Sequence, residues 1–315
     1  MLRIGFVLVP NFQVMSFAAM SVFEFANVSA GEKLYDVRYL SEGGGLLGGS
    51  MNMAIQTEAF GGEPFDTLIF CSGIGIRTGS PALLQYARDA LEASRRVASI
   101  CMGAFLLAEA GVLDGRRATT HWLGAQDLAD RYPKVRMEED RIFIIDGPVW
   151  TSAGMSAGMD MALGMLEKDF GGELARVVAQ KLVLYHRRAG GQSQHSALLE
   201  MNPKSDRIQN ALAYARNNLR KALTVEELAE AACLSPRQFS RAFSAETGQS
   251  PAKAVESLRL EAARLMMEQS RHTVDVVAEE TGFGDRERMR RAFVRAFGQP
   301  PQALRRAARE EALVS

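Results

Sequence analysis

A cysteine and a histidine near the middle of the chain are of the types that could form a thiol nucleophile. Cys101 follows the apolar run RVASI and precedes GAFLLAEAG, which places it between a strand and a helix. A helix N-terminus in this setting lowers the pKa of a thiol and leaves it accessible. His121 follows in TTHW, and histidine is the usual base beside a nucleophilic cysteine. The two residues need not meet, and a buried structural cysteine is the alternative.

Arginines gather near the end of the chain. Although the formal net charge of the 315 residues is zero, residues 285–309 contain eight arginines against Asp285 and Glu287. Such a cluster on a short helical segment is typical of a surface that binds phosphate groups. A solvated helix face is the alternative when charge is the only observation. The cluster favours a nucleic-acid partner.

The elements that would carry Cys101 and His121 alternate along the first part of the chain. Short apolar runs are separated by helical patterns, the first of which extends to about Phe25; the runs are IGFVLV, YDVRYL, DTLIF, RVASI, RATT, RIFII and VWTSA. This alternation predicts a mostly parallel sheet with helices on its faces. Glycine-rich stretches at residues 43–49 and 71–76 indicate turns, and neither matches a phosphate-binding fingerprint.

The strand pattern ends after Thr151. Residues 155–188 have a helical pattern, and the polar stretch 189–206 has the glycine and proline content of a linker. We therefore expect an α/β domain over residues 1–190, a linker over 191–206 and an all-α domain over 207–315. The length of 315 residues fits two domains, and 47% hydrophobic content is enough for a core in each.

The C-terminal part contains an internal repeat. Residues 234–251 align with residues 284–301 at an offset of 50, and each segment follows a short amphipathic pattern, TVEELAEAACL or TVDVVAEETGF. A duplicated helix-turn-helix unit explains this similarity. The second helix of each unit is expected to begin at a capping residue, Ser235 or Asp285.

Each of these second helices has an apolar face and a polar face. Phe239 with Phe243, and Met289 with Phe293, are spaced four apart and are expected to pack inward. The opposite faces carry residue types that bond base edges or phosphates in the major groove. We expect the DNA contacts to come from Arg237, Gln238, Ser240 and Arg241 in the first unit and from Arg286, Glu287, Arg290 and Arg291 in the second.

A long helical pattern at residues 251–270 connects the two units. At 1.5 Å per residue it would span roughly 28 Å, close to the roughly 34 Å of one DNA turn. A single chain is therefore predicted to read two successive major grooves.

The C-terminal segment resembles the AraC/XylS family of transcription regulators. The resemblance is carried by LSPRQFSRAF, by the G-x-S-P of residues 248–251, by LRLEAARLMM, and by EETGF followed by RAFVRAFGQPP. It implies binding to an operator in double-stranded DNA. In the first turn Cys233 stands where a glycine is usual; we expect it, like Cys71, to be a small buried residue rather than a redox switch.

The N-terminal part resembles the ThiJ/PfpI branch of the class I glutamine-amidotransferase-like fold over residues 3–190. SICMGAFLLAEAGVLDGRRATTHW and TSAGMSAGMDMALGMLE carry this resemblance. Joined to an AraC-type tail, the pattern resembles GlxA-type regulators, in which the former catalytic pocket serves as a ligand site. The resemblance implies that Cys101 and His121 face one pocket beside the glycine turn at Gly73, and we add Met102 and Ser16 to the expected ligand-binding residues.

Enzymes of this branch place an acidic residue from the start of the first helix against the cysteine. Ser16 occupies that position here, so the carboxylate that would share a proton with the thiol is missing. Glu24 lies about two turns away and is a poor substitute. We therefore expect a ligand sensor without catalysis. A PfpI-like cysteine hydrolase or deglycase with an accessory DNA-binding tail is the alternative.

Further expectations concern partners and location. The resemblance implies a small nitrogen-containing effector, such as an amino acid, an amine or a betaine, and we expect a homodimer. No metal or cofactor site is predicted, because three widely spaced cysteines and four scattered histidines match no ligand spacing. No run of about 18 apolar residues predicts a membrane span. The N-terminal apolar run is typical of a buried strand rather than a signal peptide, which favours a cytoplasmic protein.

Overall fold

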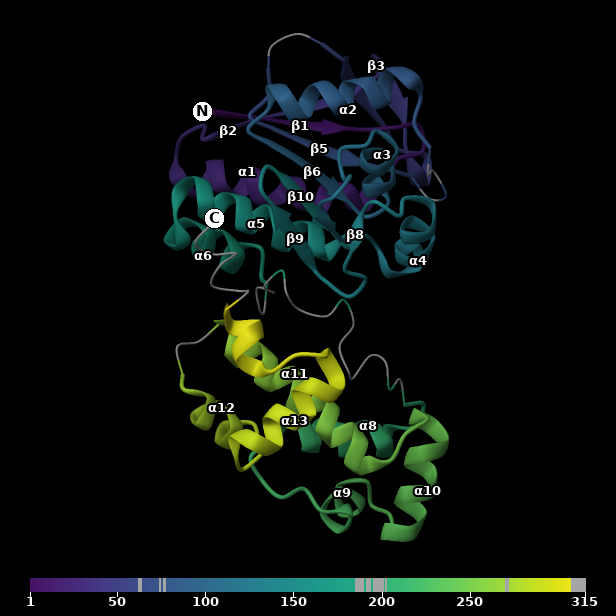
Figure 1. Ribbon diagram of the computed structural model, residues 1–315, viewed down its shortest axis with the longest axis vertical. Helices are drawn as coiled ribbons and strands as arrows, with labels where there is room; N and C mark the ends of the chain where they lie inside the picture. Colours follow the sequence, from purple (N-terminus) through teal and green to yellow (C-terminus); the bar gives the residue numbers. More distant parts are fainter. Residues whose placement is uncertain are drawn as a thin grey trace. The chain divides into compact units, whose positions relative to one another are not determined.

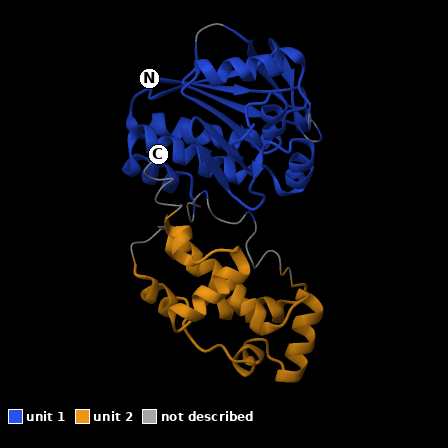
Figure 2. Cartoon of the chain, in the orientation of Figure 1, with its two compact units in different colours: residues 1–194 blue, residues 195–315 orange. Residues whose placement is uncertain are grey.

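The computed structural model describes residues 1–61, 64–73, 75, 78–184, 190, 194, 201, 203–269 and 272–306. The chain divides into two compact units, residues 1–194 and residues 195–315 (Figure 2). The first unit combines strands and helices, and the described part of the second is helical. Among the described residues, none of the helices has both the length and the apolar character needed to cross a lipid bilayer.

The described part of the first unit is built on one eight-stranded sheet, with the strand order β3-β4-β2-β1-β5-β6-β10-β9 (Figure 1). The six inner strands are parallel, and β3 and β9 pair antiparallel at the two edges. The predicted mostly parallel sheet is confirmed. Its strands are β1 (Leu2–Val7), β2 (Tyr35–Ser41), β3 (Gly43–Gly48), β4 (Ala54–Ala59), β5 (Thr67–Cys71), β6 (Arg96–Ile100), β9 (Phe143–Asp146) and β10 (Val149–Ser152).

Helices cover both faces of this sheet (Figure 1). One face is covered by α1 (Ala18–Ala30), α5 (Ser156–Phe170) and α6 (Gly172–Lys181), and the other by α2 (Pro81–Ala93) and α3 (Gly103–Glu109). Alternating side chains of β1 supply the two cores: Ile4 and Phe6 pack with α1, whereas Val7 packs with α2 and α3. The carboxyl ends of the parallel strands therefore lie along one edge of the sheet, between the two helical layers.

Three local expectations are wrong. The glycine-rich residues 43–49 are not simply a turn, because most of them form β3, whose pairing with β4 outweighs the weak strand preference of glycine. In RATT only Arg117–Ala118 form a strand, β7, which pairs with β8 (Arg136–Met137) outside the main sheet. The helix expected over residues 155–188 is broken at Gly171, whose φ of +92° ends α5; residues 185–188 and most of the expected linker lie outside the described residues.

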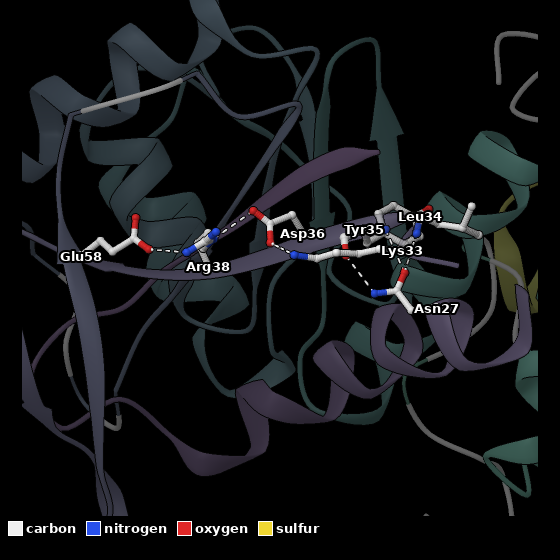
Figure 3. A network of polar contacts seen from close by, with 7 residues as sticks. All are labelled: Asn27, Lys33, Leu34, Tyr35, Asp36, Arg38 and Glu58. Atoms are coloured by element: carbon white, nitrogen blue, oxygen red, sulfur yellow. Dashed lines mark hydrogen bonds and ion pairs between the residues drawn. The ribbon is translucent and has the colours of Figure 1, made fainter. Parts of the chain in front are cut away.

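A polar network joins α1 to the neighbouring strands (Figure 3). Asn27, near the end of α1, donates to the carbonyl of Tyr35 and accepts from the N–H of the same residue. The carboxylate of Asp36 accepts from Lys33 and Arg38, and Arg38 also reaches a glutamate of β4. These hydrogen bonds, that of Lys33 first, hold the pKa of Asp36 below its usual value. The network fixes the end of α1 against β2.

The second unit contains the two predicted helix-turn-helix units, α9 with α10 and α12 with α13. Its helices are α8 (Asp206–Asn217), α9 (Val225–Ala231), α10 (Pro236–Thr247), α11 (Pro251–Gln269), α12 (Val274–Glu280) and α13 (Arg286–Phe297). Each unit has its own apolar core, and α11 contributes to both. Ala254 and Leu258 belong to the first core, whereas Ala263 and Met267 belong to the second.

The loop after α8 holds the two helix-turn-helix units together. The buried guanidinium of Arg259, on α11, donates to the carbonyl of Leu219 over 3.2 Å. The same carbonyl lies directly against Gly282 in the turn of the second unit, where no Cβ would fit. Arg220 forms ion pairs with two glutamates of α12. The relative placement of α10 and α13 is therefore fixed by buried and surface contacts.

Candidate functional sites

Loops that follow four parallel strands meet at the carboxyl edge of the sheet. The short 3-10 helix η1 (Val14–Phe17) follows β1, Gly73 follows β5, Cys101 follows β6 and Gly154 follows β10. Phe12 forms a backbone bridge with Gly73, which joins the first two of these loops. In open α/β sheets, ligands bind at this edge. The candidate ligand site lies here.

Cys101 occupies a tight turn between β6 and α3. Its φ of +55° lies in the left-handed region, which costs a non-glycine residue about 1 to 3 kcal/mol. Its N–H donates to the carbonyl of Ser152 over 3.1 Å. Gly154 packs directly on the cysteine, and a Cβ there would come within 2.9 Å of the Cys101 Sγ. The strand-turn-helix setting predicted for Cys101 is confirmed.

This turn does not activate the thiol. Burial raises the pKa of Cys101 above its usual value, and the N–H of Met102 opposes that rise more weakly. The lowered pKa expected from the start of a helix is therefore wrong, because burial destabilises the thiolate more than the N–H of Met102, at the start of α3, stabilises it.

Ser16 lies beside a second cysteine at the same edge. It is buried in η1, close to Cys71, the last residue of β5, whose thiol donates to the carbonyl of Ile69. Burial raises the pKa of Cys71 to about 12, and the nearby Cys101 contributes to the rise. Cys71 is fully buried, as predicted. Ser16 and the two cysteines are therefore neighbours.

His121 lies at the start of α4 (Trp122–Arg131). It follows Thr120, which contacts the Cys101 turn directly. Its Nδ1 accepts from the N–H of Leu123 over 3.3 Å. The hydroxyl of Thr120 donates to the carbonyl of Cys101 over 2.8 Å. The side chain of Met102 lies against Gly124 on α4. The predicted residues Cys101, Met102 and His121 are thus linked by contacts between the Cys101 turn and α4.

Four residues of this edge were not foreseen as parts of the site: Cys71, Thr120, Gly154 and Gln194. Gly154 follows the last residues of a predicted strand, a position that could have marked it. Gln194 falls in the expected linker, and its sequence surroundings carry no signal for the contacts that it makes with Thr120 and Trp122.

The first recognition helix, α10, presents a polar face. Phe239 and Phe243 are buried, whereas Arg237 and Arg241 are exposed and Ser240 is half-buried. The cap at Ser235 is confirmed. Its N–H and hydroxyl both donate to Oε1 of Gln238, over 3.3 and 2.8 Å. The carbonyl oxygen of Gln238 is therefore engaged in the cap, which leaves its amide protons for a DNA contact.

The second recognition helix, α13, presents a cationic face. Met289 and Phe293 are buried, the cap at Asp285 is confirmed, and the predicted contact residues are exposed: Arg286, Glu287, Arg290 and Arg291. Arg290 forms two hydrogen bonds with Glu287 over 2.7 and 2.8 Å, which lower the pKa of that carboxyl. Arg288 is exposed on the same helix. It aligns with Gln238 at the offset of the repeat and is not among the predicted contact residues.

Cys233 is exposed, so the expectation of a buried residue is wrong. Its φ of +52° shows why a glycine is usual at this turn. The equivalent residue of the second helix-turn-helix unit is Gly282, with a φ of +78°. The two turns make the same backbone hydrogen bonds, from the N–H of Cys233 to Glu230 and from that of Gly282 to Glu279.

Comparison with known proteins agrees with this architecture. Residues 22–168 match the DJ-1/PfpI family, and residues 228–307 match a helix-turn-helix domain family. The crystal structure of an AraC family transcriptional regulator from Pseudomonas putida matches 58% of this chain and 100% of its own, with a TM-score of 0.54 and 24% identity. This likeness shows the fold.

Two curated relatives match nearly the whole chain. The HTH-type transcriptional regulator GbdR of Pseudomonas aeruginosa is 30% identical, and the match covers 95% of this chain and 83% of that protein. The HTH-type transcriptional regulator GlxA of Rhizobium meliloti is also 30% identical, with 96% and 95% covered. The chain therefore belongs to the family of DNA-binding transcriptional regulators that join a DJ-1/PfpI domain to an AraC-type helix-turn-helix domain.

Proposed function

We propose that α10 and α13 contact operator DNA through Arg237, Gln238, Ser240, Arg241, Arg286, Glu287, Arg290 and Arg291, and that a small molecule bound beside Cys101 controls this binding. The observation that carries the proposal is the repeated recognition helix. In both copies a capped helix start and a buried aromatic face leave arginines exposed on the opposite side. This arrangement suits two adjacent major grooves.

The DNA contacts are tested by replacing one arginine in each helix. Arg241→Ala with Arg291→Ala should weaken binding to an operator fragment, obtained by selection from random duplexes, by about 1 to 3 kcal/mol for each base-reading arginine that is replaced. Fluorescence anisotropy at several salt concentrations measures the dissociation constant. Removing an arginine that reads a base relaxes the preference at one base pair, whereas removing one that binds phosphate weakens all sequences alike. An unchanged operator affinity would contradict the assignment.

The ligand site is proposed to consist of Cys101, His121, Ser16, Gly73 and Met102, together with Thr120 and Gly154. Its effector is proposed to be an amino acid, an amine or a betaine. The half-exposed indole of Trp122, stacked beside the ring of His121, supports this class, because aromatic faces attract ammonium groups. A thermal-shift screen of such compounds should find one that stabilises the protein, by about 2.7 kcal/mol at 100 times its dissociation constant.

Cysteine chemistry is the second candidate function, because the strained turn at Cys101 is a setting in which nucleophiles occur. We propose that catalysis is absent. Support comes from the raised pKa of the thiol and from Ser16 at the position of the acid. Hydrolase and deglycase assays of the wild type and of Cys101→Ala decide the matter. Turnover that requires Cys101 would show that the N-terminal domain acts as an enzyme rather than as a ligand sensor.

A homodimer is proposed because regulators of this architecture bind paired sites. The helices in residues 155–184 add no support, since α5 and α6 pack with α1 over the sheet. Sedimentation at micromolar concentration, with and without DNA, should show a dimer, and a monomer under both conditions would contradict the proposal.

A further inference from the structure

Gln194, the last residue of the first unit, bonds the backbone on both sides of His121. Its Nε2 donates to the carbonyl of Thr120 over 2.8 Å, and its Oε1 accepts from the N–H of Trp122 over 2.9 Å. Nε2 also donates to the carbonyl of Glu139 over 2.8 Å. The side-chain amide therefore uses its oxygen and both of its protons.

These bonds complete the start of α4. The N–H of Trp122 is one of the first donors of this helix, which have no partner inside the helix. Gln194 supplies that partner from far along the chain. His121 supplies a second one through its Nδ1, which accepts from Leu123. The backbone on either side of His121 is thus held by one residue, and its ring is held by the cap.

The contacts continue from Gln194 to the candidate pocket. Thr120, whose carbonyl accepts from Gln194, donates its hydroxyl to the carbonyl of Cys101. The N–H of Gln194 donates to Asp140 over 2.8 Å, and the carbonyl of Gly190 accepts from Phe143 at β9. The chain that leaves the first unit is therefore attached next to the pocket.

The residues just before α8 contact the first recognition helix. Met201 is buried in the core that contains Phe239 and Phe243. Glu246 on α10 accepts from the N–H and the hydroxyl of Ser205, over 2.9 and 2.8 Å. These bonds hold the pKa of Glu246 below its usual value. Gln194 is thus bonded beside His121, and Ser205, at the start of α8, is bonded to the first recognition helix.

We infer that Gln194 is a positioning residue of the candidate ligand site, which holds His121 beside the Cys101 turn and couples occupation of that site to α10 through the chain that continues to Ser205. The inference rests on the proposed ligand control of DNA binding. A ligand that moves His121 or Thr120 loosens the bonds of Gln194, and the change reaches α10 through the attachment at Ser205.

The positioning role is tested in the full-length protein with Gln194→Ala. Gln126→Ala is a matched control, because Gln126 lies on α4 and bonds only Asp130 one turn away. We expect amide hydrogen exchange in residues 120–124 to rise about tenfold in Gln194→Ala and to stay unchanged in Gln126→Ala. Gln194→Glu keeps an acceptor for Trp122 but loses both donors, so its exchange should lie between the two. Exchange in Gln194→Ala equal to the wild type would overturn the inference.

The coupling is tested with iodoacetamide, which occupies the pocket by alkylating Cys101. All variants carry Cys233→Ser, because Cys233 is exposed and would also react. Alkylation should change the dissociation constant for the selected operator about fivefold in the background protein and in Gln126→Ala, and much less in Gln194→Ala. An equal change in Gln194→Ala would overturn the inference and leave ligand control standing. No change in any variant would instead remove ligand control itself, and the inference with it.

Discussion

The two recognition helices have the same framework but different surfaces. In both, a side chain caps the start, an aromatic or methionine residue pairs with a phenylalanine four residues later, and a glycine in the left-handed region ends the helix. On α10 the exposed face mixes Arg237 and Arg241 with uncharged residues, and its glutamine is engaged in the cap. On α13 the same positions are mostly arginines, one of them paired with Glu287.

The difference shows which parts of the repeat are constrained. The cap and the core residues decide whether the helix forms and where it packs, so both copies keep them. The exposed positions decide which part of the DNA is contacted. A dense cationic face suits phosphates, which any sequence presents, whereas isolated arginines among neutral residues suit base edges. We therefore expect α13 to supply more of the affinity and α10 more of the sequence preference.

Removing two arginines from each helix should give the largest effect and test this division. Arg288→Ala with Arg291→Ala should weaken binding by about 4 kcal/mol and lower the slope of log affinity against log salt by about 2, for specific and random DNA alike. Arg237→Ala with Arg241→Ala should weaken operator binding more than random binding. Anisotropy titrations on both DNAs measure this. The reverse pattern would exchange the roles of the two helices.

The turns before the recognition helices differ in how much room they leave. Gly282→Ala should destabilise the second helix-turn-helix unit by about 3 kcal/mol. Its Cβ would meet the carbonyl of Leu219, and alanine disfavours the left-handed backbone conformation of this turn. Urea unfolding of the full-length protein measures the change, with exposed Gly298→Ala as a control for backbone strain alone. Equal losses in the two variants would show that the carbonyl contributes nothing.

The opposite change in the first turn should have a smaller effect of the opposite sign. Cys233→Gly should raise the free energy of unfolding by about 1 kcal/mol, because glycine adopts the left-handed conformation without strain. Cys233→Ser keeps the strain and serves as the control. A lower free energy of unfolding in Cys233→Gly would mean that the exposed thiol stabilises the fold by more than the backbone strain destabilises it.

The smallest effect is expected from the ion pair on α13. Glu287→Gln removes a negative charge beside three arginines and releases Arg290, so binding to random DNA should tighten roughly threefold, the size expected for one exposed pair. The gain should fade at high salt. An equal gain in operator binding would indicate that Glu287 makes no base contact.

Local sequence signals predicted the helix-turn-helix units in residues 195–315 better than the candidate ligand site in residues 1–194. The caps at Ser235 and Asp285 and the phenylalanine spacing are written within a few neighbouring residues, so the pattern alone located both recognition helices. The exposure of Cys233 was missed because a left-handed turn leaves no apolar pattern to distinguish it from a buried cysteine. The role of Gln238 in the cap was likewise hidden, since the same residue type also reads adenine.

The candidate ligand site depends on contacts between distant parts of the chain. The turn at Cys101 followed from a strand and a helix on either side of it, but the direction of its pKa shift depends on burial by Gly154 and other loops. The closeness of Ser16 to Cys71 joins η1 to the end of β5, more than fifty positions along the chain. Gln194 lies more than seventy positions from its partners at the start of α4, and no periodicity connects them.

The connection between the two DNA-reading units has a consequence for how their target can change. Along α11, Leu258 belongs to the first core and Leu260 to the second, so the helix has one face for each unit. Inserting one residue between them would turn the second unit by about 100° around the helix axis, which would aim α13 away from the groove. Inserting three or four would restore its direction and move it by about one turn, roughly 5 Å. The distance between the DNA segments contacted by α10 and α13 can therefore change in steps of one turn of the α-helix α11, but not one base pair at a time.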